Sequence, residues 1–100
     1  MSSQEVEQPS DAIRIVLTMV NRRGLHARAA AKFVRTAENF DSAILVEKDG
    51  QSVPGRSIMG LLMLAATLGT NITVTLSGRQ AREAADALSA LVNNGFGETD

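Results

Sequence analysis

The spacing of apolar residues switches repeatedly between a period of two and a helical period, and this pattern orders the secondary structure of the chain. Alternation, or a run of strand-forming side chains, predicts three strands at residues 12–20, 43–47 and 71–77. Apolar residues three and four apart predict two amphipathic helices at residues 26–39 and 79–93. The first helix would turn Phe33 and Val34 toward a core, and the last helix would do the same with Leu88 and Val92.

Two further elements follow from turn and capping signals in the middle of the chain. Asp49-Gly50 is typical of a type I′ hairpin turn, in which both central residues take a positive φ. It predicts a short return strand at residues 51–53. Ser57 is a favourable N-cap residue, so residues 58–68 are predicted to form a short apolar helix.

The resulting order, β-α-β-β-α-β-α, predicts an α+β fold. We expect an open-faced two-layer sandwich, in which a four-stranded antiparallel sheet carries three helices on one face. The 100 residues suffice for one such domain, which we place at residues 12–96. Residues 1–11 and 97–100 are mostly polar and are expected to form a flexible N-terminal tail and a C-terminal tail.

Composition argues against several classes of protein. The chain has no cysteine, which rules out disulfides and thiolate chemistry and fits a reducing cytoplasm. With one histidine and no cysteine, neither a metal site nor a cofactor is expected. A net charge of −1, without Trp or Tyr, argues against nucleic-acid binding. No apolar run is long enough to cross a membrane, and residues 1–9 lack a secretory signal pattern.

The single histidine, His26, lies where the first predicted helix begins. A helix start offers unpaired backbone N–H groups, here at Ala27, Ala29 and Ala30, and its partial positive charge favours a neutral imidazole. Arg28 follows two residues later and can hold an anion with its planar guanidinium. The glycine two residues earlier permits a tight backbone that turns His26 outward. These features suit a phosphoryl group that is bound transiently to nitrogen.

Other roles for His26 are open at this point. An isolated histidine near a helix start is often a capping or surface residue, and no second histidine or neighbouring carboxylate supports hydrolysis. The chain could instead be a small-molecule-binding regulatory module of ferredoxin-like shape without phosphorylation, which requires a buried His26 and a concave apolar pocket. It could also be an interaction domain that docks through its second helix, in which case His26→Ala would leave partner binding unchanged.

Three segments carry a resemblance to a known family. The segment Gly24-Leu25-His26-Ala27-Arg28-Ala29-Ala30 resembles the phosphorylation site of the HPr family, the phosphocarriers of the bacterial phosphoenolpyruvate-dependent phosphotransferase system. Residues 56–64 are similar to the family's second helix with its regulatory serine. Residues 91–96 resemble the C-terminal end of the nitrogen-related branch, called NPr. The resemblance covers about residues 12–96 and implies the same sandwich fold.

The resemblance implies a phosphocarrier rather than an enzyme that turns over by itself. His26 would accept a phosphoryl group on Nδ1 from Enzyme I and pass it to an enzyme IIA protein, serving regulation more than sugar uptake. Arg28 would steady the phosphate. Ala29 stands where the family most often has proline, and we expect only a small effect on rate. The protein is expected to be a cytoplasmic monomer.

Charge and apolar surface indicate where partners would dock. Arg22 and Arg23 precede the site and can steer an acidic partner. Residues 58–64 are more apolar than one buried face requires, so Met59 and Met63 are expected to stay exposed as an adaptable docking patch. The spacing places four other residues of this region in the core, namely Ile58, Leu61, Leu62 and Ala65.

Ser57 has two interpretations. As an N-cap residue, it would stabilise the second helix by about 1 kcal/mol. As the regulatory serine that the resemblance implies, it would accept a phosphate from an HPr kinase/phosphorylase. The added negative charge would then weaken the binding of acidic partners.

Overall fold

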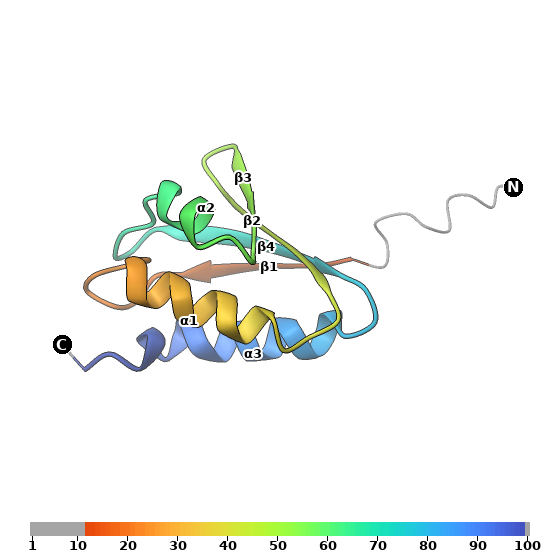
Figure 1. Ribbon diagram of the computed structural model, residues 1–100. Coiled ribbons are helices and arrows are strands. Elements are labelled where there is room, and N and C mark those ends of the chain that lie inside the picture. Colours follow the sequence, from red (N-terminus) through yellow and green to blue (C-terminus); the bar gives the residue numbers. More distant parts are fainter. Residues whose placement is uncertain (1–11, 100) are drawn as a thin grey trace, which may run out of the picture.

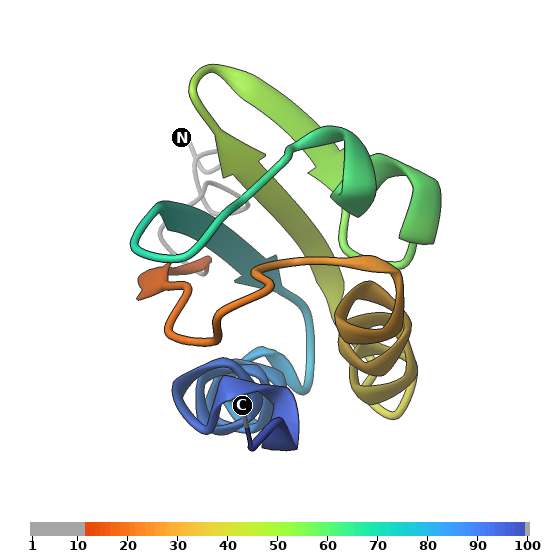
Figure 2. The same ribbon diagram turned by 90° about the vertical axis from the view of Figure 1, so that its left-hand side faces the viewer.

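The computed structural model describes residues 12–99, so the predicted tail at residues 1–11 lies outside the described residues. One antiparallel sheet has the strand order β1-β4-β2-β3, and its strands are Ile13–Thr18 (β1), Ala43–Lys48 (β2), Gln51–Pro54 (β3) and Asn71–Ser77 (β4). The helices are Ala27–Ala37 (α1), Ile58–Met63 (α2), Ala81–Asn93 (α3) and the short 3-10 helix Gly95–Gly97 (η3). The α-helices lie on one face of the sheet (Figure 1, Figure 2), which confirms the predicted open-faced sandwich.

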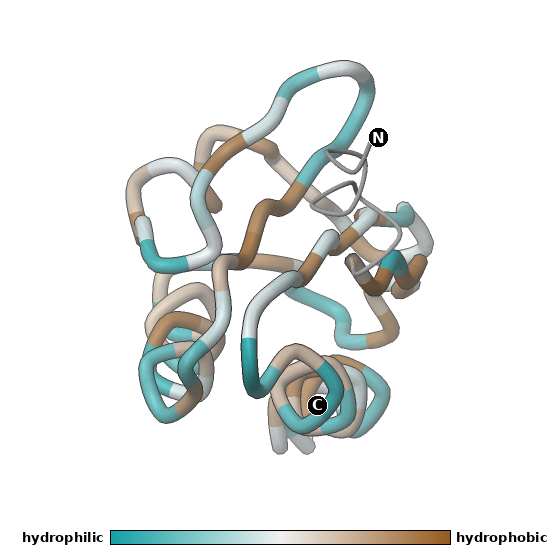
Figure 3. Tube along the Cα trace, turned by 90° about the vertical axis from the view of Figure 1, so that its right-hand side faces the viewer, coloured by the Kyte–Doolittle hydropathy of each residue, from teal (hydrophilic) through white to brown (hydrophobic). Residues whose placement is uncertain are grey.

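The register of the sheet explains the alternation in the sequence. Leu17 lies opposite Ile72 across the β1–β4 pair, and Ile44 lies opposite Leu76 across the β2–β4 pair, all four buried under the helices. Intervening residues such as Val16 point to the other face and are exposed. Figure 3 shows the hydrophobic residues following the strands through the middle of the molecule. The period of two therefore reflects burial on one side only.

The β2–β3 hairpin confirms the turn predicted from Asp49-Gly50. Asp49 has a φ of 52° and Gly50 a φ of 82°, which is the pair of positive values that a type I′ turn requires. Lys48 pairs with Gln51 at the base of the turn. The return strand ends at Pro54, one residue later than predicted, and as the edge of the sheet it tolerates a proline.

The long helices bury the faces that their spacing predicts. On α1, Phe33 and Val34 are buried against the sheet together with Ala29, Ala30 and Ala37. On α3, Leu88 and Val92 are buried together with Ala81, Ala84 and Ala85. Small alanines on both helices allow close packing, and α1 and α3 contact each other beneath the sheet.

The second helix is shorter than predicted, because it ends at Met63 instead of continuing to residue 68. Ala65 has a φ of 52°, a left-handed conformation that stops the helix. The expected core positions are therefore only partly right. Leu61 is buried and Leu62 half-buried, whereas Ile58 and Ala65 are exposed. An apolar run fixes neither the end of a helix nor the face that it buries.

The C-terminal end differs from the expected tail. Gly97 closes η3 and is exposed, whereas the Glu98 side chain bonds to Asn21 and His26 and so is attached to the domain. The anchor is Phe96, which is 1% exposed. Within residues 12–99, the structure has no helix long and apolar enough to cross a membrane.

Candidate functional site

His26 lies at one end of the molecule, where two loops are bound to each other. The loop between β1 and α1 meets the loop between α2 and β4 through the Leu25 N–H, which donates to the Ala66 carbonyl at 2.8 Å. Met19 and Thr70 are joined in the same way at 2.9 Å. Figure 2 looks onto this end, where the C-terminal segment also lies. The position of His26 is thus fixed by backbone contacts between segments far apart in sequence.

Gly24 makes the close contact between these loops possible. Its φ is +63°, and a Cβ at this position would lie 2.3 Å from the Ala66 carbonyl oxygen. Both the dihedral angle and the space therefore require glycine. The sequence predicted a tight backbone before His26, and the structure adds the reason, which is the approach of the second loop.

His26 is the N-cap residue of α1, with an extended backbone and no capping bond from its side chain. Its side chain is 16% exposed, so it is reachable from solvent but mostly enclosed. The ring atom Nε2 is hydrogen-bonded to Oε2 of Glu98. Glu98 lies 72 residues further along the chain, and no local pattern in the sequence indicated it.

Glu98 is held by a second partner on its other oxygen. The Asn21 side-chain amide is buried and donates to Glu98 Oε1 at 2.9 Å and to the Gly24 carbonyl at 2.8 Å. Burial alone would raise the pKa of Glu98, but the hydrogen bonds with Asn21 and His26, together with the positive charge of Arg23, hold that pKa below its ordinary value. The ionised carboxylate therefore favours the folded state, and this contribution is lost as the pH falls through the lowered pKa.

The start of α1 presents three backbone donors that have no acceptor among residues 12–99. These are the N–H groups of Ala27, Arg28 and Ala29. The prediction for Ala30 is wrong, because its N–H donates to the His26 carbonyl at 2.8 Å and closes the first helical turn. The first turn contains no acidic residue, so no side chain there offsets the partial positive charge of the helix start.

The basic residues near His26 differ in their contacts. Arg22, Arg23 and Arg28 are exposed, and their guanidinium groups have no hydrogen-bond or ion-pair partner among residues 12–99. Lys32 is engaged instead, because its ammonium group donates to the Phe96 carbonyl at 2.7 Å. Three exposed arginines close to His26 in the sequence thus add positive charge to this end of the molecule, and the charge of Arg23 also acts on Glu98.

The α2 surface carries the predicted exposed methionines. Met59 is 69% exposed and Met63 is 63% exposed, and Ile58 adds further apolar surface. The helix packs against α1, and Figure 2 shows it near the start of α1. The sequence reasoning missed Ile58 as part of this surface because it assigned that residue to the core.

Ser57 caps α2, as predicted. Its Oγ accepts a hydrogen bond from the Gly60 N–H at 2.9 Å. We expect Ser57→Ala to lower the free energy of unfolding by about 1 kcal/mol, because that N–H loses its acceptor. Ser57→Asp, whose carboxylate can also cap, is the matched control and should stay close to wild type. Urea denaturation of both variants checks the difference, and equal losses would contradict the capping role.

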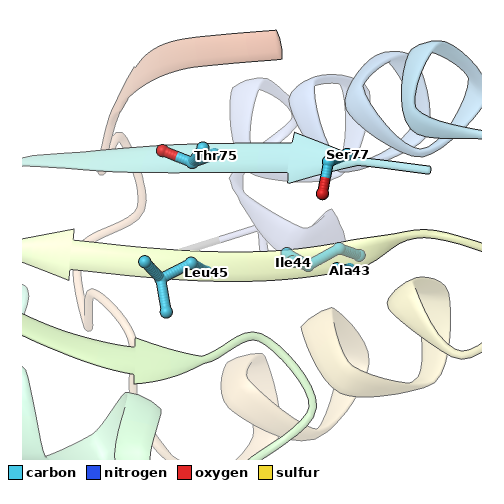
Figure 4. A pocket seen from close by; sticks show the side chains of 5 residues that line it. All are labelled: Ala43, Ile44, Leu45, Thr75 and Ser77. Carbon is cyan, nitrogen blue, oxygen red and sulfur yellow. The ribbon is translucent and has the colours of Figure 1, made fainter. Parts of the chain in front are cut away.

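A shallow pocket lies elsewhere, on the face of the sheet that the helices leave open. Its lining comes from β2 and β4, namely Ala43, Ile44, Leu45, Thr75 and Ser77 (Figure 4). These residues lie near the end of α1 and the start of β2, whereas His26 begins α1, so the pocket does not contain the histidine. The small-molecule hypothesis required a buried His26 and a concave apolar pocket, whereas the His26 side chain is 16% exposed and this pocket is lined by other residues. Among residues 12–99, no three potential metal ligands cluster.

Comparison with known proteins agrees with this geometry. Residues 13–94 match the family model described as PTS HPr component phosphorylation site. The phosphocarrier protein HPr of Cupriavidus necator is 47% identical over 81 residues, which are 81% of this chain and 91% of that protein. The crystal structure of HPr from Thermoanaerobacter tengcongensis has a TM-score of 0.84 and 40% identity, covering 88% of this chain and 99% of that one.

The fold and the sequence matches define a small phosphocarrier protein rather than an enzyme that turns over by itself. The chain belongs to the HPr family of the phosphotransferase system. Its four-stranded sheet with three helices is the architecture of the solved HPr structures, including that of Bacillus anthracis at a TM-score of 0.78.

Proposed function

We propose that His26 is the residue that carries the phosphoryl group, received from Enzyme I and passed on to an enzyme IIA protein. The observation that carries this proposal is the position of His26 at the N-cap of α1, next to exposed arginines and to three N–H groups that have no acceptor among residues 12–99. A dianionic phosphoryl group is stabilised by such donors and by the positive end of the helix.

The transfer needs little from the protein beyond positioning and charge. The lone pair of Nδ1 forms the bond to phosphorus, while the bond from phosphorus to the donor breaks and its electron pair stays with the donor. The N–H groups of Ala27 and Ala29 and the guanidinium of Arg28 receive the phosphoryl oxygens. Onward transfer to enzyme IIA reverses these steps, because Nδ1 recovers its electron pair.

The test is a phosphorylation assay with phosphoenolpyruvate and Enzyme I from the same organism. We expect the intact mass to increase by one phosphoryl group that is lost in acid and retained in base, as is typical of phosphohistidine. Addition of an enzyme IIA protein should then return the mass to its starting value. No gain of mass with an Enzyme I that phosphorylates another HPr would overturn the proposal.

We further propose that the protein serves a regulatory, nitrogen-related branch of the phosphotransferase system, in the cytoplasm and as a monomer. The support is the C-terminal sequence Leu91-Val92-Asn93-Asn94-Gly95-Phe96, which resembles that of NPr proteins. We expect faster phosphorylation by the Enzyme I of the nitrogen branch than by that of the sugar branch. Equal initial rates, or a faster reaction with the sugar-branch enzyme, would contradict this assignment.

For the docking surface we propose Arg22 and Arg23 together with Met59 and Met63. Exposed methionines adapt to several partners, and the arginines suit acidic ones.

We also propose Ser57 as a regulatory site for an HPr kinase/phosphorylase. Its half-buried hydroxyl lies beside these methionines in the sequence, so a phosphate there would place negative charge on the surface that acidic partners approach.

A further inference from the structure

The segment 95–98 is fixed to the domain at three points. Phe96 is buried, and the Lys32 ammonium group holds its carbonyl. Phe96 also has a φ of 58°, a conformation that non-glycine residues rarely adopt and that the surrounding contacts must hold. Glu98 forms the third point of attachment through Asn21 and His26. Together these contacts hold Glu98 next to the start of α1.

Both oxygens of the Glu98 carboxylate have a defined partner. Oε1 accepts from the Asn21 amide, which is itself held by the Gly24 carbonyl, and Oε2 bonds to His26 Nε2. The side chain is 12% exposed, so solvent competes weakly for these bonds. The carboxylate is therefore oriented by groups other than the histidine, and it can in turn orient the ring.

We propose that Glu98 is a positioning residue for His26: it accepts the Nε2 proton and so leaves Nδ1 unprotonated and directed toward the incoming phosphoryl group. This inference rests on the proposed role of His26. The geometry selects between the ring atoms, because a carboxylate is an acceptor only and the nitrogen facing it must carry the hydrogen. Nδ1 is then the atom with the free lone pair.

The same carboxylate also matches the charge change of the transfer. When Nδ1 gives its lone pair to phosphorus, the proton stays on Nε2 and the ring becomes a phosphoimidazolium with a positive charge. The Glu98 carboxylate is hydrogen-bonded to the ring that carries this charge. Arg23 is the other charged group that acts on Glu98, and Lys32 holds the segment that contains Glu98 through the Phe96 carbonyl. The carboxylate thus stabilises the phosphorylated state more than the free one.

The decisive experiment compares wild type with Glu98→Gln, which keeps the shape of the side chain and removes its charge. We expect phosphorylation by Enzyme I to slow by about tenfold or more, and its dependence on pH to shift. Nitrogen-15 NMR of the ring should show the Nε2–H tautomer in wild type and a mixture in the variant. Glu83→Gln, an exposed glutamate on α3, is the control and should behave as wild type.

Lys32→Met provides a second, independent variant, because it keeps much of the aliphatic side chain and removes the ammonium group, with its charge and its bond to the Phe96 carbonyl. It should slow phosphorylation less than Glu98→Gln does, and should add little in the double variant. An unchanged rate and tautomer in Glu98→Gln would overturn the positioning role, and so would a faster rate, which would mean that the carboxylate repels the phosphoryl group. Phosphorylation of wild type in the same assay tests the proposed role of His26, so a failure of that role can be distinguished from a failure of the role proposed for Glu98.

Discussion

His26→Ala is expected to lose phosphoryl acceptance completely while the protein stays folded. The chain contains no other histidine, and no thiol could replace it. The side chain makes no capping bond to the helix, so its removal leaves the start of α1 intact. Intact mass after incubation with phosphoenolpyruvate and Enzyme I measures acceptance, and circular dichroism measures the fold. Full acceptance by the variant would place the phosphoryl group on another residue.

Arg28→Ala extends this test to the phosphate contacts. It should retain the reaction at a lower rate, because the backbone N–H groups of the first turn remain. Arg35→Ala is its matched control, since Arg35 is an exposed arginine in the last turn of the same helix. Equal effects of the two substitutions would show that only the general positive charge matters.

Gly24→Ala is expected to destabilise the protein by more than about 2 kcal/mol, the largest effect we predict for adding a single methyl group. A positive φ of 63° disfavours any side chain, and the new Cβ would overlap the Ala66 carbonyl oxygen. The two loops would separate, so phosphoryl acceptance should fall further than the loss of folded protein explains. Thermal unfolding measures the loss of stability, and the phosphorylation rate of the folded protein measures the additional loss of phosphoryl acceptance.

Gly69→Ala separates the two causes. Gly69 has a φ of 86°, but a Cβ there would have no atom within 4 Å. Only the dihedral penalty of about 1–2 kcal/mol should remain, with phosphorylation close to wild type. If Gly24→Ala and Gly69→Ala had the same effect, the contact with Ala66 would not matter to the site.

Local patterns in the sequence predicted what is decided locally. The turn at Asp49-Gly50, the buried face of α1 and the cap at Ser57 each depend on neighbouring residues, and each was found where expected. The end of α2 was not, because Ala65 takes a left-handed conformation that alanine does not signal. Its stop comes from the contacts of the next residue, Ala66, with the loop before α1.

The same distinction holds for the site. His26 and the free N–H groups follow from a helix start, which the sequence indicates. The prediction for Ala30 failed because Ala30 is the fourth residue of α1. Its N–H group is the first in the helix with a backbone acceptor, the carbonyl of the N-cap residue His26. Glu98 and Asn21 could not be found, because they meet only when the two ends of the domain are brought together. The two residues of the Asn21–Glu98 contact lie 77 residues apart, so no local period or motif in the sequence indicates it.

The bonds between residues 19–25 and the loop that follows α2 also limit how this protein can be recombined with its relatives. Residues 57–70 carry Ser57 and the two exposed methionines, Met59 and Met63, and a designer seeking new partners would exchange them first. Their backbone is matched to Met19, Gly24 and Leu25, however, so a graft of that segment alone would shift the His26 ring. The two stretches form one transferable module, so the proposed docking surface and the proposed phosphorylation site would have to be exchanged together.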